Sequence, residues 1–188
     1  MVCKLNRLVA LCSMSHVEDG RLERYAPQFA RRSRRTCYGR IDSTARRRLT
    51  PRRSPVHGRG VFALQPIAAG ARLIEYIGEV TNLRRAAARQ RSETGHKFVF
   101  GLSDGRLIDG NLGGNSARFI NHACAPNCEA IETGYRVFIH ALIAIEPDDE
   151  LFIVYSLAGD GEISEEVRAH YACHCGAATC RQSMLARA

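Results

Sequence analysis

The chain has 188 residues and a formal net charge of +8. This length fits one domain with an appendage and is enough to build a sizeable core. No stretch approaches the ~20 consecutive apolar residues of a membrane span, and the apolar run at residues 8–12 is too short for the core of a signal peptide. We therefore expect no membrane association and no secretion through a signal peptide.

The positive charge is concentrated in an N-terminal arm, which we place at residues 1–51. Residues 1–53 contain fourteen Lys and Arg against four Asp and Glu, whereas the remaining 135 residues contain thirteen against fifteen. The arm has no sustained apolar period and carries arginine runs at residues 31–35 and 46–48, a pattern typical of disordered segments. Two interpretations stay open: an arm that contacts nucleic acid or an acidic partner, and a solvated tail or a stretch upstream of the true start codon.

After residue 54 the pattern changes to short apolar runs separated by Gly, Pro and Asp turns, which predicts strands. Helical character is confined to two short segments. The sequence therefore predicts a mainly β domain with short helices and argues against a parallel doubly wound sheet, whose strands would alternate with longer helices. The predicted strands are residues 60–64, 72–77, 96–102, 106–108 and 135–140, the turns are 67–70 and 145–149, and the helices are 82–90 and 164–170.

Eight cysteines could indicate disulfides, but three of them are spaced like metal ligands. Cys173, Cys175 and Cys180 lie within eight residues, and no secretory signal points to an oxidising compartment. Zinc prefers four thiolate or imidazole ligands in a tetrahedron. From the residues alone, the fourth ligand is either Cys124 or Cys128.

Several motifs, in order along the chain, resemble those of SET-domain protein-lysine methyltransferases. HGRGVFA at residues 57–63 resembles the opening glycine loop of that family, and EYIGE at 75–79 resembles the strand and turn that follow it. RFINHACAPNC at 118–128 resembles the signature loop, and DELFIVY at 149–155 resembles the closing segment with its catalytic tyrosine. The cysteine tail resembles the post-SET zinc motif. The resemblance covers roughly residues 52 to 185.

This resemblance implies a SET-type β-fold with a knot-like cofactor loop and a small zinc-bound C-terminal tail. It places the catalytic domain at residues 52–156 and the post-SET tail at 157–188. It also favours Cys124 over Cys128, because the family's usual ligand follows the Asn-His pair by two residues. The implied zinc ligands are Cys124, Cys173, Cys175 and Cys180.

The implied cofactor is S-adenosyl-L-methionine, the methyl donor. Glycines without side chains let the backbone approach its amino-acid end, and an amide with adjacent backbone groups can satisfy an adenine edge. Phe98 stands where many members have a tyrosine, which removes one hydrogen bond. The implied cofactor-binding residues are His57, Gly58, Arg59, Gly60, Phe98, Arg118, Asn121 and His122.

Tyr155 and Tyr76 are the predicted catalytic residues, lining a channel for the target lysine. A hydroxyl can orient the amine, and ring faces can flank its aliphatic stem. The competing interpretation for Tyr76 is a core aromatic, and for His122 a locally satisfied core histidine. Ile153 and Val154 replace the aromatic and the aspartate that usually precede the terminal tyrosine.

The implied function is protein-lysine methylation of a histone-like or other basic protein tail, in the cytoplasm or, if the protein is delivered there, on host chromatin. No cysteine-rich pre-SET module is present, which puts a histone H3 lysine 9 substrate in doubt. The rival hypothesis is a catalytically silent binding module. Acidic residues predicted to receive a basic peptide are Glu146, Asp148, Asp149, Glu150, Glu162, Glu165 and Glu166.

Overall fold

The structure is a computed structural model that describes residues 7–8, 47–92, 98–157 and 164–186. Most of the predicted arm, residues 9–46, therefore lies outside the described residues, as does the start of the strand predicted at 96–102. Among the described residues, no helix has the length and apolar character needed to cross a membrane.

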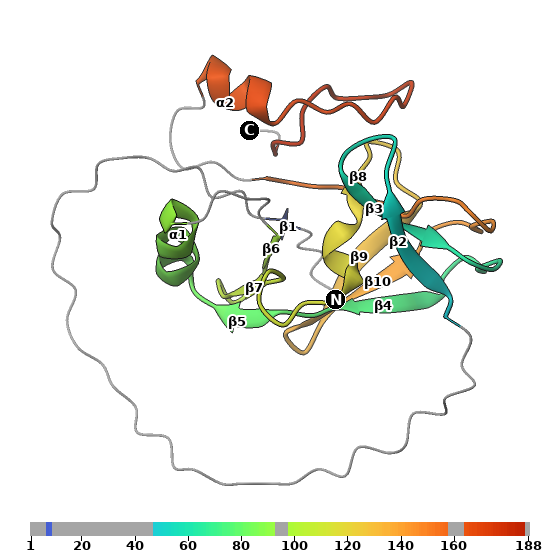
Figure 1. The fold of residues 1–188 in the computed structure, drawn as a ribbon, viewed down its shortest axis with the longest axis horizontal. Coiled ribbons are helices and arrows are strands. Elements are labelled where there is room, and N and C mark those ends of the chain that lie inside the picture. Colours follow the sequence, from blue (N-terminus) through green and yellow to red (C-terminus); the bar gives the residue numbers. More distant parts are fainter. Residues whose placement is uncertain (1–6, 9–46, 93–97, 158–163, 187–188) are drawn as a thin grey trace, which may run out of the picture. The chain divides into compact units, whose positions relative to one another are not determined.

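Four small sheets form the body (Figure 1). The largest has the order β1 (Arg7–Leu8), β6 (Val99–Gly101), β7 (Leu107–Asp109) and β5 (Glu79–Thr81), all antiparallel. The second is the antiparallel set β4 (Arg72–Tyr76), β10 (Arg136–Ala141) and β9 (Cys128–Thr133). β2 (Leu49–Arg53) pairs antiparallel with β3 (Arg59–Ala63), whereas β8 (Asn121–His122) and β11 (Phe152–Ile153) pair in parallel.

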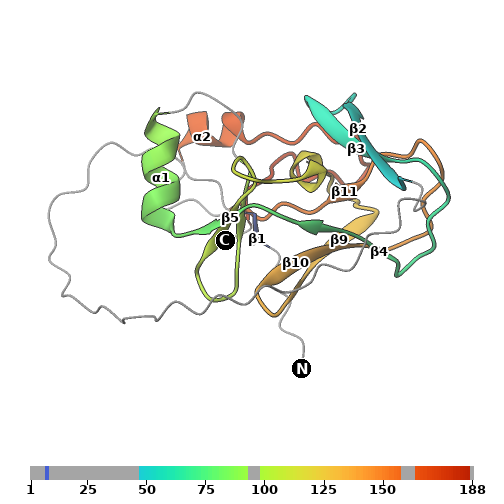
Figure 2. The ribbon, with the colours of Figure 1, turned by 60° about the horizontal axis from the view of Figure 1, so that its bottom comes forward.

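The helices are short and have polar caps. α1 (Leu83–Ser92) begins where the Asn82 side chain accepts from Arg85 N. It follows β5 at the edge of the largest sheet (Figure 2), and Ala86 packs against Val99 and Leu107. α2 (Glu165–His170) is capped by the Ser164 hydroxyl, and a 3₁₀ helix spans Ser116–Phe119. The prediction of a mainly β fold with short helices is confirmed.

The boundary predicted for the arm needs correction. β2 begins at Leu49 and pairs with β3 along its whole length, so the ordered body starts before residue 52. The apolar alternation is weak in this strand because Thr, Pro and Arg occupy most of it. β2 is part of a sheet because it pairs with β3, and not because its own residues alternate between apolar and polar.

The core lies between the second sheet, β3 and the closing segment. Val61, Val137, Ile139 and Leu151 are fully buried. The two predicted turns also meet here: Ile67 and Ile145 exchange both backbone hydrogen bonds at 2.9 Å. This bridge ties the β3–β4 connection to the chain that follows β10, and so fixes where the segment from residue 150 to 155 begins.

Candidate active site and zinc centre

The glycine turn between β2 and β3 is held by one serine. Ser54 N donates to Gly58 O at 3.0 Å, and Ser54 Oγ accepts from the backbone N–H groups of Val56 and His57 at 3.0 and 3.3 Å. Gly58 has a φ of +50°, a left-handed conformation that residues with a Cβ rarely adopt. The serine and the glycine together give the turn one defined shape.

Gly60 lies against a buried carboxylate. A Cβ at position 60 would collide with Glu150 Oε1, so no larger residue fits without a shift. This same oxygen accepts from Asn121 Nδ2 at 2.8 Å, and Nδ2 also donates to the carbonyls of His57 at 3.1 Å and Arg59 at 3.0 Å. Asn121 therefore joins β8 to the glycine turn, and Gly60 makes room for Glu150; neither role was predicted from the sequence.

Of the two predicted catalytic tyrosines, Tyr76 is buried and Tyr155 is partly buried, and both hydroxyls are directed at backbone carbonyls. Tyr155 Oη donates to Ile120 O at 2.5 Å, and Tyr76 Oη donates to Phe98 O at 3.0 Å. Burial is the main cause that raises the pKa of each phenol above its usual range, with Glu150 adding to the effect at Tyr155. Both phenols are therefore protonated at neutral pH and suited to orient a group rather than to act as a phenolate base.

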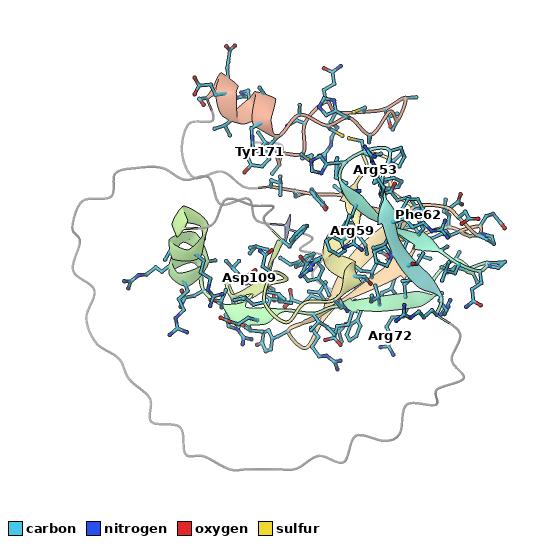
Figure 3. The ribbon with its side chains drawn as sticks, viewed as in Figure 1. Arg53, Arg59, Phe62, Arg72, Asp109 and Tyr171 are labelled. Carbon is cyan, nitrogen blue, oxygen red and sulfur yellow. The ribbon has the colours of Figure 1, made fainter. Side chains whose placement is uncertain are left out.

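A cationic and aromatic cluster lies beside the glycine turn. The guanidinium groups of Arg59 and Arg118 lie 4.4 Å and 4.7 Å from the centre of the Phe119 ring. Figure 3 labels Arg59 among the side chains drawn as sticks. Phe98 meets Phe119 edge-on, with 5.5 Å between ring centres. Arg118 donates to Gly110 O at 2.9 Å, but its buried Nε has no hydrogen-bond partner among the described residues.

The glycine turn, β8, the two tyrosines and the cationic and aromatic cluster all line one cavity of about 780 Å³. Seven of the eight predicted cofactor-binding residues line it, as do both predicted catalytic tyrosines; Gly60 does not, because it faces Glu150. The wall is completed by residues that the sequence did not single out, from the segment after β11 and from the tail. These are Leu157, His170, Tyr171, Ala172, His174 and Met184, together with Cys173.

The predicted zinc ligands come together in space. The Sγ atoms of Cys124, Cys173, Cys175 and Cys180 all lie within 4.8 Å of one another. Cys128 is instead buried in β9, and burial raises the pKa of its thiol to about 12. Cys124 is thus the fourth member of the cluster, and the alternative left open by spacing is resolved.

The cluster has the dimensions and chemistry of a structural zinc site. Tetrahedral zinc with Zn–S bonds of about 2.3 Å places its sulfurs ~3.8 Å apart. Cys124 Sγ lies 3.8 Å from Cys173 Sγ and 4.0 Å from Cys180 Sγ. Backbone N–H groups also point at the sulfurs, from Arg181 to Cys124 at 3.3 Å and from Cys124 to Cys175 at 3.4 Å. Such donors stabilise thiolates, so the four residues fit zinc.

One member of the predicted acidic peptide site, Glu150, needs correction. Glu162 lies outside the described residues, and none of the other six members lines the cavity. Five of these are exposed, and Asp148 forms an ion pair with Arg52. Glu150 is only 8% exposed and holds internal hydrogen bonds, so it is not a surface charge available to a peptide.

The comparisons with known proteins agree with this geometry. The SET domain family matches residues 58–156. The histone-lysine N-methyltransferase, H3 lysine-4 specific, of Candida albicans is 36% identical over 137 residues, covering 69% of this chain and 13% of that protein. The histone-lysine N-methyltransferase SETD1A of Homo sapiens is 35% identical over 143 residues, covering 70% of this chain and 8% of that protein.

A solved structure of ctPRC2 in complex with H3K27me3 and H3K27M contains a similar chain. It superposes with a TM-score of 0.53 at 26% identity, covering 56% of this chain and 14% of that chain. Because the family match extends over more than half of the residues, the chain belongs to the SET domain family. It spans only 8% to 13% of the length of the two relatives named above.

Proposed function

We propose that this chain is an S-adenosylmethionine-dependent protein-lysine N-methyltransferase, with the body from the start of β2 at Leu49 to residue 156 as its catalytic domain and residues 157–188 as a zinc-binding tail. The observation that supports this most is the shared cavity wall. The glycine turn, the strand Asn121–His122, Tyr76 and Tyr155 all line one cavity. The curated names of the relatives, which are histone-lysine N-methyltransferases, support the same reaction class.

The cavity suits the cofactor in size and in charge. Its volume of about 780 Å³ lies in the range of small-molecule sites. The unpartnered Nε of Arg118 is a charged donor, which the carboxylate end of an amino-acid ligand would satisfy. S-adenosylmethionine, when bound, would supply a methyl group activated by its sulfonium.

Residues of this chain would position the substrate's target lysine and exclude water from its amine. Tyr155 Oη and Tyr76 Oη are fixed by carbonyl acceptors, so each can present a lone pair in a defined direction. Ile153 and Leu157 contribute apolar side chains to the cavity wall, and an apolar site disfavours the charged form of an amine. Orientation and desolvation would then account for most of the rate, with no dedicated base.

The substrate we propose is a basic, histone-like protein tail, and the site of action is chromatin or an equivalent nucleoprotein. The name of the Candida albicans relative, which specifies lysine 4 of histone H3, supports the first. Exposed arginines at the start of the described body, among them Arg48 and Arg53, support contact with nucleic acid. Salt-dependent binding to DNA, lost when these arginines are changed to serine, would test that contact.

One experiment separates this enzyme from a silent binding module. Purified protein with radiolabelled S-adenosylmethionine is offered recombinant histones and a whole-cell lysate, while calorimetry measures cofactor binding. We expect label on lysine and saturable cofactor binding. A folded, zinc-loaded protein that binds no cofactor and transfers no label would instead support the silent module.

A further inference from the structure

Glu150 is a buried carboxylate that the proposed chemistry does not use. Its side chain is 8% exposed, and its two oxygens contact two different segments. Oε2 accepts from Ser54 Oγ at 2.9 Å, and Oε1 accepts from Asn121 Nδ2 at 2.8 Å. Burying a charged group costs free energy unless the group is well hydrogen-bonded. The buried carboxylate of Glu150 therefore calls for a structural role.

The backbone of Glu150 is held from both sides, which fixes where its carboxylate can go. Asn127 Nδ2 donates to Glu150 O at 2.8 Å, and the next residue, Leu151, donates from its N–H to Val61 O at 2.7 Å. The absence of a side chain at Gly60 leaves the space that the carboxylate occupies. Glu150 is therefore a rigid support rather than a mobile surface charge.

The two segments that it supports, the glycine turn and β8, both line the cavity. Ser54 Oγ orders the glycine turn through the N–H groups of Val56 and His57, and Asn121 Nδ2 holds the same turn through the His57 carbonyl. A single carboxylate thus fixes the serine on one side of the turn and the amide on the other. From this juxtaposition we infer that Glu150 is a positioning residue that sets the affinity of the cavity for S-adenosylmethionine. The inference rests on the proposed function for its ligand.

The test uses the full chain with its zinc, and starts from Glu150→Gln, which keeps size and shape but removes the charge. Calorimetry should give cofactor binding about tenfold weaker, the loss expected when a charge-assisted hydrogen bond becomes neutral. Turnover at saturating cofactor should change by less than about threefold, because the lysine channel is untouched. Ser54→Ala, at the turn itself, should weaken binding in the same way. Glu129→Gln on β9, away from the cavity wall, is the matched control and should change neither quantity.

A double-mutant cycle asks whether Glu150 acts through Asn121. In an Asn121→Ala background the further effect of Glu150→Gln on the dissociation constant should be smaller than in the unaltered chain, because only the contact with Ser54 remains to be weakened. Fully additive losses, or unchanged cofactor affinity in a folded Glu150→Gln protein, would overturn the inference.

Amide exchange gives a readout that needs no cofactor. The N–H groups of Val56 and His57 should exchange about tenfold faster in Glu150→Gln than in the unaltered chain, because the serine that they contact loses its support. If the unaltered chain binds no S-adenosylmethionine, the proposed enzyme function fails. The exchange rates then decide the role of Glu150 alone, and equal rates would refute it.

Discussion

The backbone N–H of Tyr155 donates a hydrogen bond of 2.8 Å to Nδ1 of His122. Because Nδ1 accepts, the imidazole carries its proton on Nε2, which lies 3.3 Å from Sγ of Cys124. Burial first, and the charge of Arg181 second, lower the pKa of His122 to about 4 and favour this neutral form. One ring therefore connects the closing segment to the signature loop and to the cysteine cluster.

Zinc and cofactor binding should be lost together. Cys175→Ser removes one of four clustered thiols, and Tyr171, Cys173 and Met184 on the cavity wall all come from the tail that the cluster anchors. We expect elemental analysis to show a large loss of zinc, and calorimetry to show cofactor binding weaker by about tenfold or more. Cys128→Ala is the control, since its thiol is buried apart from the cluster. Zinc-free wild-type protein with full cofactor affinity would contradict the prediction.

Tyr155→Phe should lower turnover far more than cofactor affinity. The change removes the hydroxyl that donates to Ile120 O while leaving the ring and its contact with His122 in place. We expect kcat to fall by about a hundredfold, as for a misplaced reactant, with the cofactor dissociation constant nearly unchanged. Tyr135→Phe, an exposed tyrosine 55% accessible to solvent, is the matched control. Full activity of Tyr155→Phe would show that another group orients the amine.

Ile153 should determine how many methyl groups are added. It is 3% exposed, lines the cavity and pairs with His122 in the β8–β11 ladder. Isoleucine has no hydroxyl and leaves room for a methylated nitrogen to turn, so we expect di- or trimethyllysine. Ile153→Tyr should shift the product toward monomethyllysine, whereas Ile153→Val should not. Mass spectrometry of a peptide at long reaction times measures this, and a wild-type reaction that stops at one methyl group would assign the limit elsewhere.

Truncation should separate the arm from the body. Deleting residues 1–46 removes β1, a two-residue strand at the edge of the largest sheet, but retains β2, so we expect the fold and basal peptide methylation to survive. Deleting residues 1–53 removes β2 and its pairing with β3, and should lower Tm by about 3 °C or more. Differential scanning calorimetry makes the comparison. Equal Tm values for the two truncations would mean that β2 adds nothing to stability.

The raised pKa values of the two cavity tyrosines, Tyr76 and Tyr155, predict a loss of stability at high pH. An unfolded tyrosine has a pKa of about 10, and burial raises the folded pKa of Tyr76 and Tyr155 above that value. Their contribution to stability is therefore fully present below pH ~10 and is lost as the pH rises further. Ultraviolet titration should show tyrosinate forming only as the chain unfolds at these two positions. If both phenols ionised near pH ~10 in the folded protein, the fold would not raise their pKa values.

Much of the fold could be predicted from the sequence because local chemistry specifies it. Apolar runs between Gly, Pro and Asp turns predicted β3, β4, β7 and β10, and helical character was predicted at residues 82–90 and 164–170, where α1 and α2 lie. β8 and β11 have only two residues each, too few for any periodic signal. They become strands because they pair with each other, which is a tertiary event.

The sequence by itself determined the chemistry of this protein: three closely spaced cysteines in the tail, glycines in the turn after β2, and tyrosines and an Asn-His pair in motifs that resemble one family. Spacing left open which of Cys124 and Cys128 joins the cluster. The tertiary structure decided this, since Cys128 is buried in β9 and Cys124 lies with the other three cysteines. It alone showed that Glu150 is internal, because its partner Ser54 is 96 positions away. Spacing along a chain reports local geometry, whereas contacts between distant segments depend on how the sheets pack.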